Sequence, residues 1–250
     1  MRNRLDKLLV EQGLAPSRER AQALILAGRV LVNQQKVEKP GSSVQDTALL
    51  RVLGEEQRYV SRGGFKLEAA LTHWQIDLRG RRCADIGTST GGFTDCMLQH
   101  GAAGVVAVDT GYGQIAEGLR RDPRVALLER TNARYLKPGD LPPGISFVSM
   151  DVSFISATLV LPAVIAAVRE SRGIALQAVV EIVVLVKPQF EAGREHVGKG
   201  GIVRDPAAHQ FAIDRVRKTL HELGASASEL ADSPIAGTKG NREFLLYARF

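Results

Sequence analysis

The sequence predicts an α/β protein: a doubly wound, mostly parallel sheet of Rossmann-like type, preceded by a small α+β domain. Two observations indicate the sheet. From residue 65 onward strands alternate with helices, and the strands are apolar on both faces. Strands of this kind belong to parallel sheets that helices cover on both sides. The third observation is the different pattern of the first 57 residues, in which two helices precede short strands.

In this first segment, apolar spacing and capping residues mark the elements. Leucines recur at helical spacing from Leu5. Ser17 is expected to cap a second helix, because its hydroxyl can accept from an unpaired backbone N–H, and Gly28 supplies the stop. Two short strands joined by a tight turn are expected at 30–33 and 36–37.

The larger segment is expected to follow a charged, glycine-containing linker at 58–64, which separates domains at 1–57 and 65–250. Its pattern then alternates regularly between the two kinds of element. We expect strands at 83–86, 105–108, 125–128, 145–150, 179–186 and 244–249, and helices near 65–74, 92–100, 113–121, 157–170 and 206–223.

The composition excludes several classes of protein. The 33 Lys and Arg residues against 27 Asp and Glu give a net charge of +6, which favours an anionic partner. No apolar stretch approaches the roughly 20 residues of a membrane-spanning helix, and the N-terminus lacks the apolar core of a signal peptide. Cys83 and Cys96 form neither a disulfide framework nor a zinc-binding pattern. We therefore expect a cytoplasmic protein with no membrane partner and no metal.

A glycine-containing loop follows the first strand of the sheet, where ligands of doubly wound sheets bind. Ser89 stands where a dinucleotide fingerprint needs its second glycine, and Asp85 would repel a pyrophosphate but favour a cationic amino-acid end or sulfonium. Asp109 ends the next strand and can accept from both ribose hydroxyls. The pattern therefore favours S-adenosylmethionine over NAD. The expected cofactor residues are Asp85, Gly87, Ser89, Thr90, Gly91, Gly92, Phe93 and Asp109.

Four charged residues are candidates for catalysis. Lys66 precedes the sheet, Asp151 and Lys187 each follow an apolar strand, and Glu243 introduces the last strand. Taken singly, each is better interpreted as a solvated charge at a strand end. Beside a cofactor loop, however, they suit methyl transfer to a hydroxyl, which needs a general base. A lysine can serve if its pKa falls from about 10.4 toward 7–8, as burial and a second cation would cause.

Basic residues in the first domain are candidates for RNA binding. They can contact phosphates, which position RNA without reading its sequence. The domain lacks aromatic residues before Tyr59, so shape recognition of structured RNA is favoured over base stacking. A solvated basic face is the alternative. The residues are Arg2, Arg4, Arg18, Arg20, Arg29 and Lys36.

At these residues the sequence resembles a known family. The order Lys66, Asp151, Lys187, Glu243 resembles the K-D-K-E tetrad of the FtsJ-like (RrmJ-type) ribose 2′-O-methyltransferases. The similarity narrows to the TlyA/hemolysin A family, which joins an S4 RNA-binding domain to such a methyltransferase. The matching stretches lie at 4–6, 17–18, 28–30, 59–64, 89–95, 111–114, 129–134, 151–156, 187–191 and 201–206.

The resemblance implies a class I methyltransferase domain that methylates the ribose 2′-hydroxyl of cytidine in 16S and/or 23S rRNA, with ribosomal RNA or ribosomal subunits as partner. It implies that Lys187 is the base, that Asp151 orients it and offsets its charge, that Lys66 lowers its pKa or positions the hydroxyl, and that Glu243 completes the network. Ser17 joins the RNA-binding residues, and Asn132 is expected near the adenine. Thr88 departs from the smaller residue expected there and could crowd the methionine end of the cofactor.

Two other interpretations stay open. One is an RNA-binding protein whose methyltransferase scaffold is inactive, and another is a membrane-lysing hemolysin, after the family's second name. S4 domains also occur on pseudouridine synthases, but those enzymes need no cofactor loop. The sequence does not indicate an oligomeric state.

Overall fold

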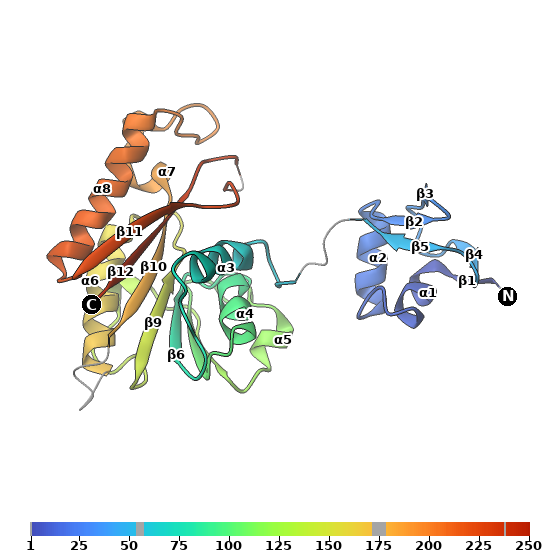
Figure 1. Cartoon of the computed structure of the whole chain (residues 1–250), viewed down its shortest axis with the longest axis horizontal. Coiled ribbons are helices and arrows are strands. Elements are labelled where there is room, and N and C mark those ends of the chain that lie inside the picture. Colours follow the sequence, from blue (N-terminus) through green and yellow to red (C-terminus); the bar gives the residue numbers. More distant parts are fainter. Residues whose placement is uncertain (1, 54–57, 172–178, 238) are drawn as a thin grey trace. The chain divides into compact units, whose positions relative to one another are not determined.

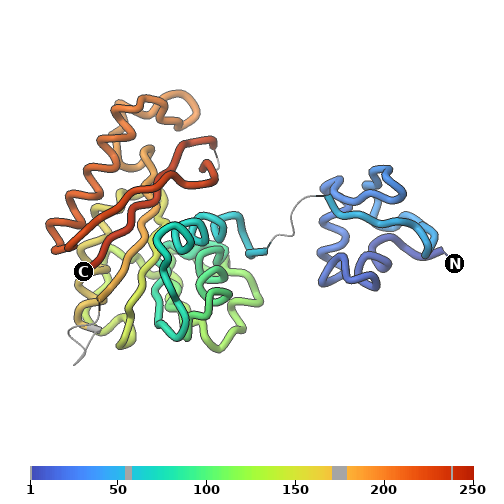
Figure 2. Tube along the Cα trace, viewed as in Figure 1, coloured from blue at the N-terminus to red at the C-terminus, as the bar shows by residue number. Residues whose placement is uncertain are grey.

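The structure is a computed structural model that describes residues 2–53, 58–171, 179–237 and 239–250. It divides into two compact units, Met1–Arg58 and Tyr59–Phe250. Figure 1 shows the elements of each unit and Figure 2 the course of the chain. The first unit is a small α+β fold and the second an α/β fold, which confirms the predicted fold class.

The first unit packs two helices against short antiparallel strands. Strand β1 pairs with β4, and β2 lies between β3 and β5. Its core includes Leu5, Leu9 and Ile25, all fully buried. Ser17 Oγ accepts from the backbone N–H of Arg20 at 3.3 Å, which confirms the predicted N-cap. The elements are β1 (Arg2–Arg4), α1 (Leu5–Glu11), α2 (Arg18–Leu26), β2 (Val30–Val32), β3 (Gln35–Lys36), β4 (Ser43–Gln45) and β5 (Leu50–Val52).

The second unit is built on a seven-stranded sheet in the order β11-β12-β10-β9-β6-β7-β8. The run from β10 to β8 is parallel, and β12 lies antiparallel between β10 and β11. The strands are β6 (Arg82–Ile86), β7 (Gly104–Val108), β8 (Val125–Leu128), β9 (Ile145–Met150), β10 (Glu181–Val186), β11 (Ala227–Asp232) and β12 (Phe244–Arg249). The helices are α3 (Gly63–His73), α4 (Gly92–Gln99), α5 (Glu117–Arg120), α6 (Ala157–Ser171), α7 (Pro188–Glu191) and α8 (Pro206–Glu222), with short 3₁₀ turns at Ala133–Tyr135 and Arg194–His196.

Helices cover both faces of this sheet (Figure 1). Because successive strand residues point to opposite faces, Ala84 and Ile86 pack with α6 and α8, whereas Cys83 packs with α3 and α4. Both faces are therefore apolar. This explains why the central strands are apolar on both faces and why their positions could be predicted.

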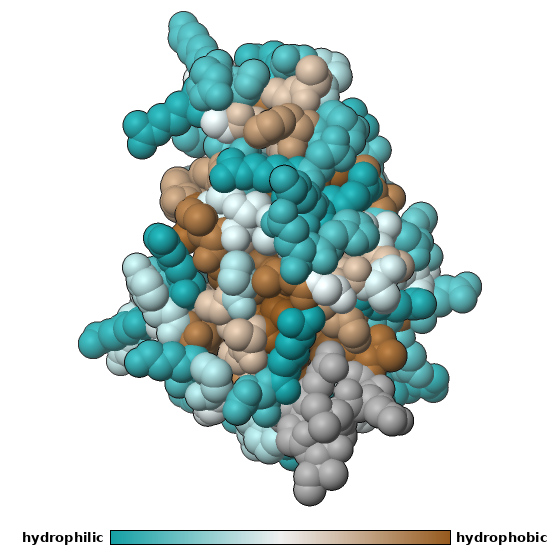
Figure 3. Space-filling view, turned by 90° about the vertical axis from the view of Figure 1, so that its left-hand side faces the viewer, coloured by the Kyte–Doolittle hydropathy of each residue, from teal (hydrophilic) through white to brown (hydrophobic). Residues whose placement is uncertain are grey.

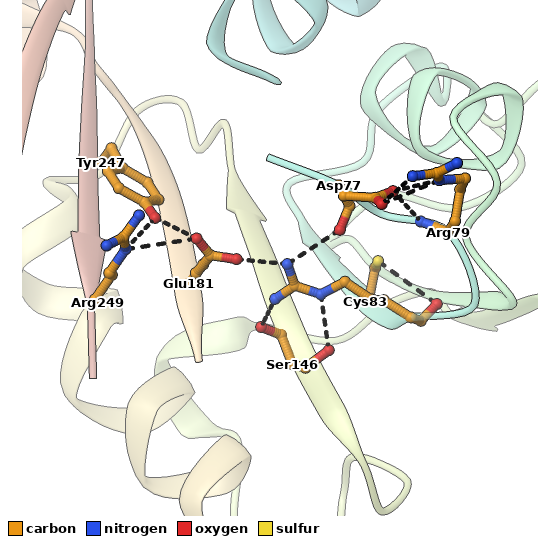
Figure 4. A network of polar contacts seen from close by, with 8 residues as sticks. Asp77, Arg79, Cys83, Ser146, Glu181, Tyr247 and Arg249 are labelled. Atoms are coloured by element: carbon orange, nitrogen blue, oxygen red, sulfur yellow. Dashed lines mark hydrogen bonds and ion pairs between the residues drawn. The ribbon is translucent and has the colours of Figure 1, made fainter. Parts of the chain in front are cut away.

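A polar network joins neighbouring strands at the end of the sheet where β9 and β10 begin (Figure 4). The Arg81 guanidinium donates to Glu181 at 2.5 Å and to Ser146 Oγ at 3.0 Å, which joins the starts of β9 and β10. Tyr247 of β12 donates to the same Glu181 carboxylate. These contacts give the charged side chains at the amino ends of the strands hydrogen-bond partners. The predicted site lies at the other end of the sheet, at the carboxyl ends of the strands.

Two elements differ from the expected pattern. The helix expected at 113–121 is shortened to α5. Gly113 has a φ of +71° and its N–H donates to Glu129 at 2.8 Å, so the residues between Gly113 and the start of α5 form a loop. Strand β11 was not expected, because as an edge strand it has mostly exposed or half-exposed side chains and no apolar pattern.

The boundary between the units also differs from the expected linker at 58–64. Tyr59 is only 1% exposed and its ring lies 5.2 Å from that of Phe65, so it is part of the second core. Gly63 and Gly64 begin α3. Residues 54–57, at the other side of the expected boundary, lie outside the described residues.

The face of the molecule in Figure 3 carries a central band of apolar side chains bordered by hydrophilic ones. Among the described residues, no helix combines the length and apolar character needed to cross a membrane.

Candidate active site

A pocket of about 520 Å³ opens at the carboxyl ends of β6, β9 and β10. The crossover connections of a parallel sheet leave this edge free for ligands. All four candidate catalytic residues line the pocket, together with most of the predicted cofactor loop. The lining includes Arg62, Lys66, Gly87, Thr88, Ser89, Thr90, Gly92, Phe93, Asp151, Ser153, Phe154, Lys187, Gln189, Phe190, Lys239 and Glu243.

The loop between β6 and α4 has a backbone that few residues other than glycine adopt. Gly87 has a φ of +87°, and a Cβ added there would lie 2.5 Å from the carbonyl oxygen of Asp151. Ser89 also has a positive φ of +51° and is held by a 2.7 Å hydrogen bond from its N–H to Asp109. A Cβ on Gly92 would lie 2.2 Å from Ser61 Oγ. The glycines therefore allow a loop with exposed backbone to lie tightly against its neighbours.

Asp85 does not reach the pocket wall. Its side chain is fully buried, and its two carboxylate oxygens accept from Thr94 Oγ1 at 2.6 Å and from Ser149 Oγ at 3.1 Å. Burial raises the pKa of this carboxyl to about 7, although the two hydroxyl donors oppose the shift. Asp85 thus connects α4 and β9 beneath the loop. We had expected its carboxylate to contact a cationic ligand directly.

Thr88 lines the pocket but is largely buried. It is 6% exposed, and its hydroxyl donates to the carbonyl of Asp85 at 3.1 Å. A hydroxyl buried and hydrogen-bonded in this way needs no ligand as a partner. The hydrogen bond fixes the Thr88 hydroxyl at the pocket wall, and crowding of the cofactor by Thr88 stays a prediction.

Three other predicted cofactor residues, Gly91, Asp109 and Asn132, do not line the main pocket. Asp109 receives N–H bonds from Ser89 and Gly111, both at 2.7 Å, and lines a small separate cavity with Gln114 and Glu129. Its oxygens keep further acceptor capacity, since each carboxylate oxygen has two lone pairs. Asn132 is exposed and caps the 3₁₀ turn through a 3.1 Å bond from Arg134 N–H, and it lines neither cavity.

The four charged residues form two separate ion pairs. Lys66 Nζ lies 2.5 Å from Glu243 Oε2, and Lys187 Nζ pairs with Asp151 Oδ1. The two lysines are each 9% exposed and Glu243 3%, so the pairs are largely shielded from water. Each cation is balanced by one carboxylate, which burial of a charge requires. The predicted grouping of these residues at one site is therefore seen. The Lys187–Asp151 pair is the contact expected from the resemblance, whereas the Lys66–Glu243 pair was not specified.

Two residues beside the Lys187–Asp151 pair were not identified from the sequence. Ser153 Oγ accepts from Lys187 Nζ at 2.8 Å. Glu191, which is 2% exposed, accepts from Ser156 Oγ at 2.5 Å and from the backbone N–H of Ala157 at 2.7 Å. Burial raises the pKa of Glu191. The signal that could have found them is their position, since both lie a few residues after a predicted catalytic residue.

Two aromatic side chains were also missed at the pocket rim. Phe154 is 92% exposed with a φ of +63°, and its ring lies 5.4 Å from that of Phe190. Both line the pocket. An exposed aromatic side chain on left-handed backbone is uncommon.

In the first unit, two of the predicted RNA-binding arginines meet at one buried carboxylate. Arg4 binds Asp6 through two nitrogens at 2.9 Å, and Arg18 Nε lies 3.0 Å from the same group. Hydrogen bonding to Arg4 is the largest cause that holds the pKa of Asp6 far below its usual range. Both guanidinium groups stay about half exposed, so the pairing orients them at the surface.

The other predicted RNA-binding residues do not share this anchor. Lys36 pairs with Glu38 at 3.0 Å, and Ser17 is occupied as the cap of α2. Arg20 is partly buried in the first turn of α2, whereas Arg2 and Arg29 are exposed.

Comparison with known families decides what kind of protein carries this site. Residues 59–250 match the FtsJ-like methyltransferases, and residues 3–49 match the S4 domain. The chain belongs to the FtsJ-like methyltransferase family. Its S4 domain lies in the first unit and its methyltransferase match coincides with the second.

Relatives over the full length narrow the family further. The chain is 45% identical over 249 residues to the 16S/23S rRNA (cytidine-2′-O)-methyltransferase TlyA of Mycobacterium tuberculosis, covering 99% of this chain and 90% of that protein. It is 47% identical to YqxC of Bacillus subtilis, covering 98% and 85%, and 39% identical to Hemolysin A of Brachyspira hyodysenteriae, covering 98% of each. These matches confirm the resemblance to the TlyA/hemolysin A family.

Solved structures agree on the fold. A candidate hemolysin from Streptococcus thermophilus aligns with a TM-score of 0.73 at 43% identity, covering 99% of this chain and 88% of that one. A candidate S-adenosylmethionine-dependent methyltransferase from Listeria monocytogenes aligns with a TM-score of 0.53 at 16% identity, covering 76% of this chain and 99% of that one. The second likeness concerns the fold of the second unit alone.

Proposed function

We propose that this protein transfers a methyl group from S-adenosylmethionine to the ribose 2′-hydroxyl of cytidine in ribosomal RNA. The observation that carries the proposal is the Lys187–Asp151 pair on the wall of the pocket that the glycine loop also lines. The name of the Mycobacterium tuberculosis relative, 45% identical over nearly the whole chain, supports the same acceptor. A ribosomal substrate goes with the cytoplasmic location expected from the sequence.

The residues present suit S-adenosylmethionine. A side chain on Gly87 or Gly92 would overlap the neighbouring atoms of Asp151 or Ser61, so the loop can lie this close to them only with glycine at both positions. The loop also lines a pocket large enough for a ligand. Gly87, Ser89, Thr90, Gly91, Gly92 and Phe93 would hold the methionine end, and Asp109 would accept from the ribose hydroxyls. When bound, the cofactor supplies a methyl group that its sulfonium already activates.

The remaining requirement is a base for the acceptor hydroxyl. In its neutral form Lys187 Nζ would accept the proton of the ribose hydroxyl, which would leave a lysine ammonium beside Asp151. The carboxylate then balances the new charge within a shielded site. Lys66 and Glu243 form a second balanced pair in the same pocket, where the Lys66 amine can donate to the ribose and position it.

The first unit would hold the RNA. Its exposed arginines are suited to phosphate contacts, and two of them are oriented by Asp6. Binding of this kind sets the position of the RNA but not the identity of the methylated base. The choice of nucleotide therefore depends on the pocket of the second unit.

The proposal is tested by transfer of a tritiated methyl group from S-adenosylmethionine to separated small and large ribosomal subunits that lack the modification. Mapping of the labelled nucleotides should find 2′-O-methylcytidine in 16S rRNA, 23S rRNA or both. Absence of transfer to either subunit would overturn the proposal. Calorimetry that also shows no binding of S-adenosylmethionine would indicate an RNA-binding protein with an inactive scaffold.

A further inference from the structure

We propose that Ser153 is a positioning residue, which orients the Lys187 amine so that its lone pair faces the acceptor hydroxyl. The inference rests on the proposed function, because it concerns the base of that reaction. It adds a fifth residue to the four charged ones, and its action passes through Lys187.

The argument begins with the hydrogen-bond capacity of the amine. In the described structure, Lys187 Nζ has two partners, Asp151 Oδ1 and Ser153 Oγ, the latter at 2.8 Å. A neutral lysine amine has two N–H bonds and one lone pair in a tetrahedral arrangement. When one N–H is donated to the Ser153 hydroxyl and the amine is held against Asp151 by the ion pair, the lone pair has one direction left. A base needs this alignment before its basicity is of use.

The position of Ser153 is itself fixed by the backbone around it. Asp151 N–H donates to the Ile86 carbonyl at 2.9 Å at the start of the segment, and Glu191 binds Ser156 and Ala157 at its end. Phe154, next to Ser153, has a left-handed φ of +63°, which the rest of the segment imposes. The Ser153 hydroxyl is thus held by a braced turn rather than by a free loop.

Without Ser153 the amine keeps one fixed partner. It can then rotate about its Cε–Nζ bond, and the lone pair points into the pocket for only part of the time. The ammonium form also loses a hydrogen-bond acceptor, so the amine gives up its proton more readily. The pocket is also lined by the charged side chains Arg62, Lys66, Lys239 and Glu243. These groups are the same with and without the Ser153 hydroxyl.

The test compares the pH dependence of methyl transfer in the full-length protein and three variants. Ser153→Ala should lower kcat about tenfold with KM for RNA unchanged, and should move the acidic limb of the pH–rate profile down by about one pH unit. Ser153→Thr keeps the hydroxyl on an exposed residue and should restore both. Ser156→Ala removes a hydroxyl from the same segment that does not contact Lys187, so it should lower the rate without moving the limb.

A second measurement does not depend on methyl transfer. Competitive acetylation with trace acetic anhydride over a range of pH, read by mass spectrometry of the Lys187 peptide, reports when this amine becomes neutral. Ser153→Ala should show the same downward displacement, and Ser156→Ala none. If the wild-type protein methylates no RNA, the proposed function fails while this measurement still reports the Lys187–Ser153 contact.

Two results would overturn the inference. One is a Ser153→Ala protein whose rate and pH profile match the wild type. The other is a Ser153→Ala protein that loses rate without displacement of the acidic limb or of the acetylation profile, because that behaviour assigns Ser153 a structural role like that of Ser156.

Discussion

The backbone N–H of Ala157 donates a 2.7 Å hydrogen bond to the Glu191 carboxylate. This contact ties the start of α6 to the end of α7. The two helices directly follow the segments that carry Asp151 and Lys187. The ion pair is therefore one of several connections between the same segments, and the contact through Glu191 is buried and lies outside the predicted tetrad.

Glu191→Ala should destabilise the second unit by about 1–3 kcal/mol, because it leaves the Ser156 hydroxyl and the N-terminus of α6 without their buried acceptor. Fluorescence of Trp74, the one tryptophan of the sequence, reports unfolding of this unit in denaturant. Glu195→Ala, at an exposed glutamate of the next turn, is the matched control and should change stability by no more than about 0.5 kcal/mol. Equal stability of the two variants would contradict the role of Glu191.

Lys187→Ala should reduce methyl transfer by about 10²–10⁴-fold, the usual contribution of a general base. Affinity for S-adenosylmethionine, measured by calorimetry, should stay within a few-fold of the wild type, because Lys187 lies outside the glycine loop. Lys218→Ala, at an exposed lysine of α8, is the control for a lost positive charge. Full activity of Lys187→Ala would exclude it as the base.

Gly87→Ala should lower cofactor affinity more than it lowers stability. The added Cβ would lie 2.5 Å from the Asp151 carbonyl, so the loop must move away from its present path. Gly139→Ala serves as control, because Gly139 has a similar φ of +91° but nothing within 4 Å of the added atom. The control should lose roughly 1 kcal/mol of stability from backbone strain and keep its cofactor affinity. Calorimetry that finds the same affinity in both variants would contradict a close-packed loop.

Asp85→Asn should change how stability depends on pH. Burial raises the pKa of Asp85 to about 7 in the folded protein, above the 3.8 of an exposed carboxyl. The folded state then binds more protons between these values, so its contribution to stability is full below about pH 4 and is lost as the pH rises toward 7. Relative to Asp85→Asn, the wild type should lose on the order of 2 kcal/mol between pH 5 and pH 7. Parallel pH curves from denaturant unfolding would show that Asp85 stays ionised.

Arg29→Ala should weaken RNA binding without affecting folding, because Arg29 is exposed on the first unit. A phosphate contact predicts that the slope of log affinity against log salt becomes shallower by about one. Lys218→Ala on the second unit should leave the slope unchanged. Filter binding to ribosomal RNA at several salt concentrations measures both, and an unaltered slope for Arg29→Ala would remove it from the RNA-binding face.

Most of the fold of the second unit could be predicted because its central strands are apolar on both faces. Strands such as β7 and β9 are buried on both faces, and a short apolar run of this kind indicates a buried strand. Strand β11 escaped prediction since an edge strand is paired on one side only and buries little. The short α5 escaped because a side-chain contact, from Gly113 N–H to Glu129, replaces the first turn of the expected helix.

The members of the site and the Lys187–Asp151 pair were predictable, whereas its other connections were not. Asp151, Lys187 and Glu243 directly follow or precede strands whose ends meet at one edge, so their grouping follows from the topology, and Lys66 joins them from the first turn of α3. The inward direction of Asp85 and the contact of Ser153 with Lys187 depend on turn geometry, such as the left-handed backbone of Phe154. Sequence spacing does not determine such dihedral angles.

The burial of Tyr59 has a practical consequence for dividing the chain. A Cβ added to Gly64 would lie 2.3 Å from Tyr59 Cγ, which shows how closely this ring fills its place beside α3. A fragment that starts at Phe65 would lack the ring and expose an empty slot on its core, whereas one that starts at Arg58 keeps it. Protease trimming of the folded protein should therefore stop before Tyr59, and the catalytic fragment recovered should begin with this tyrosine or ahead of it.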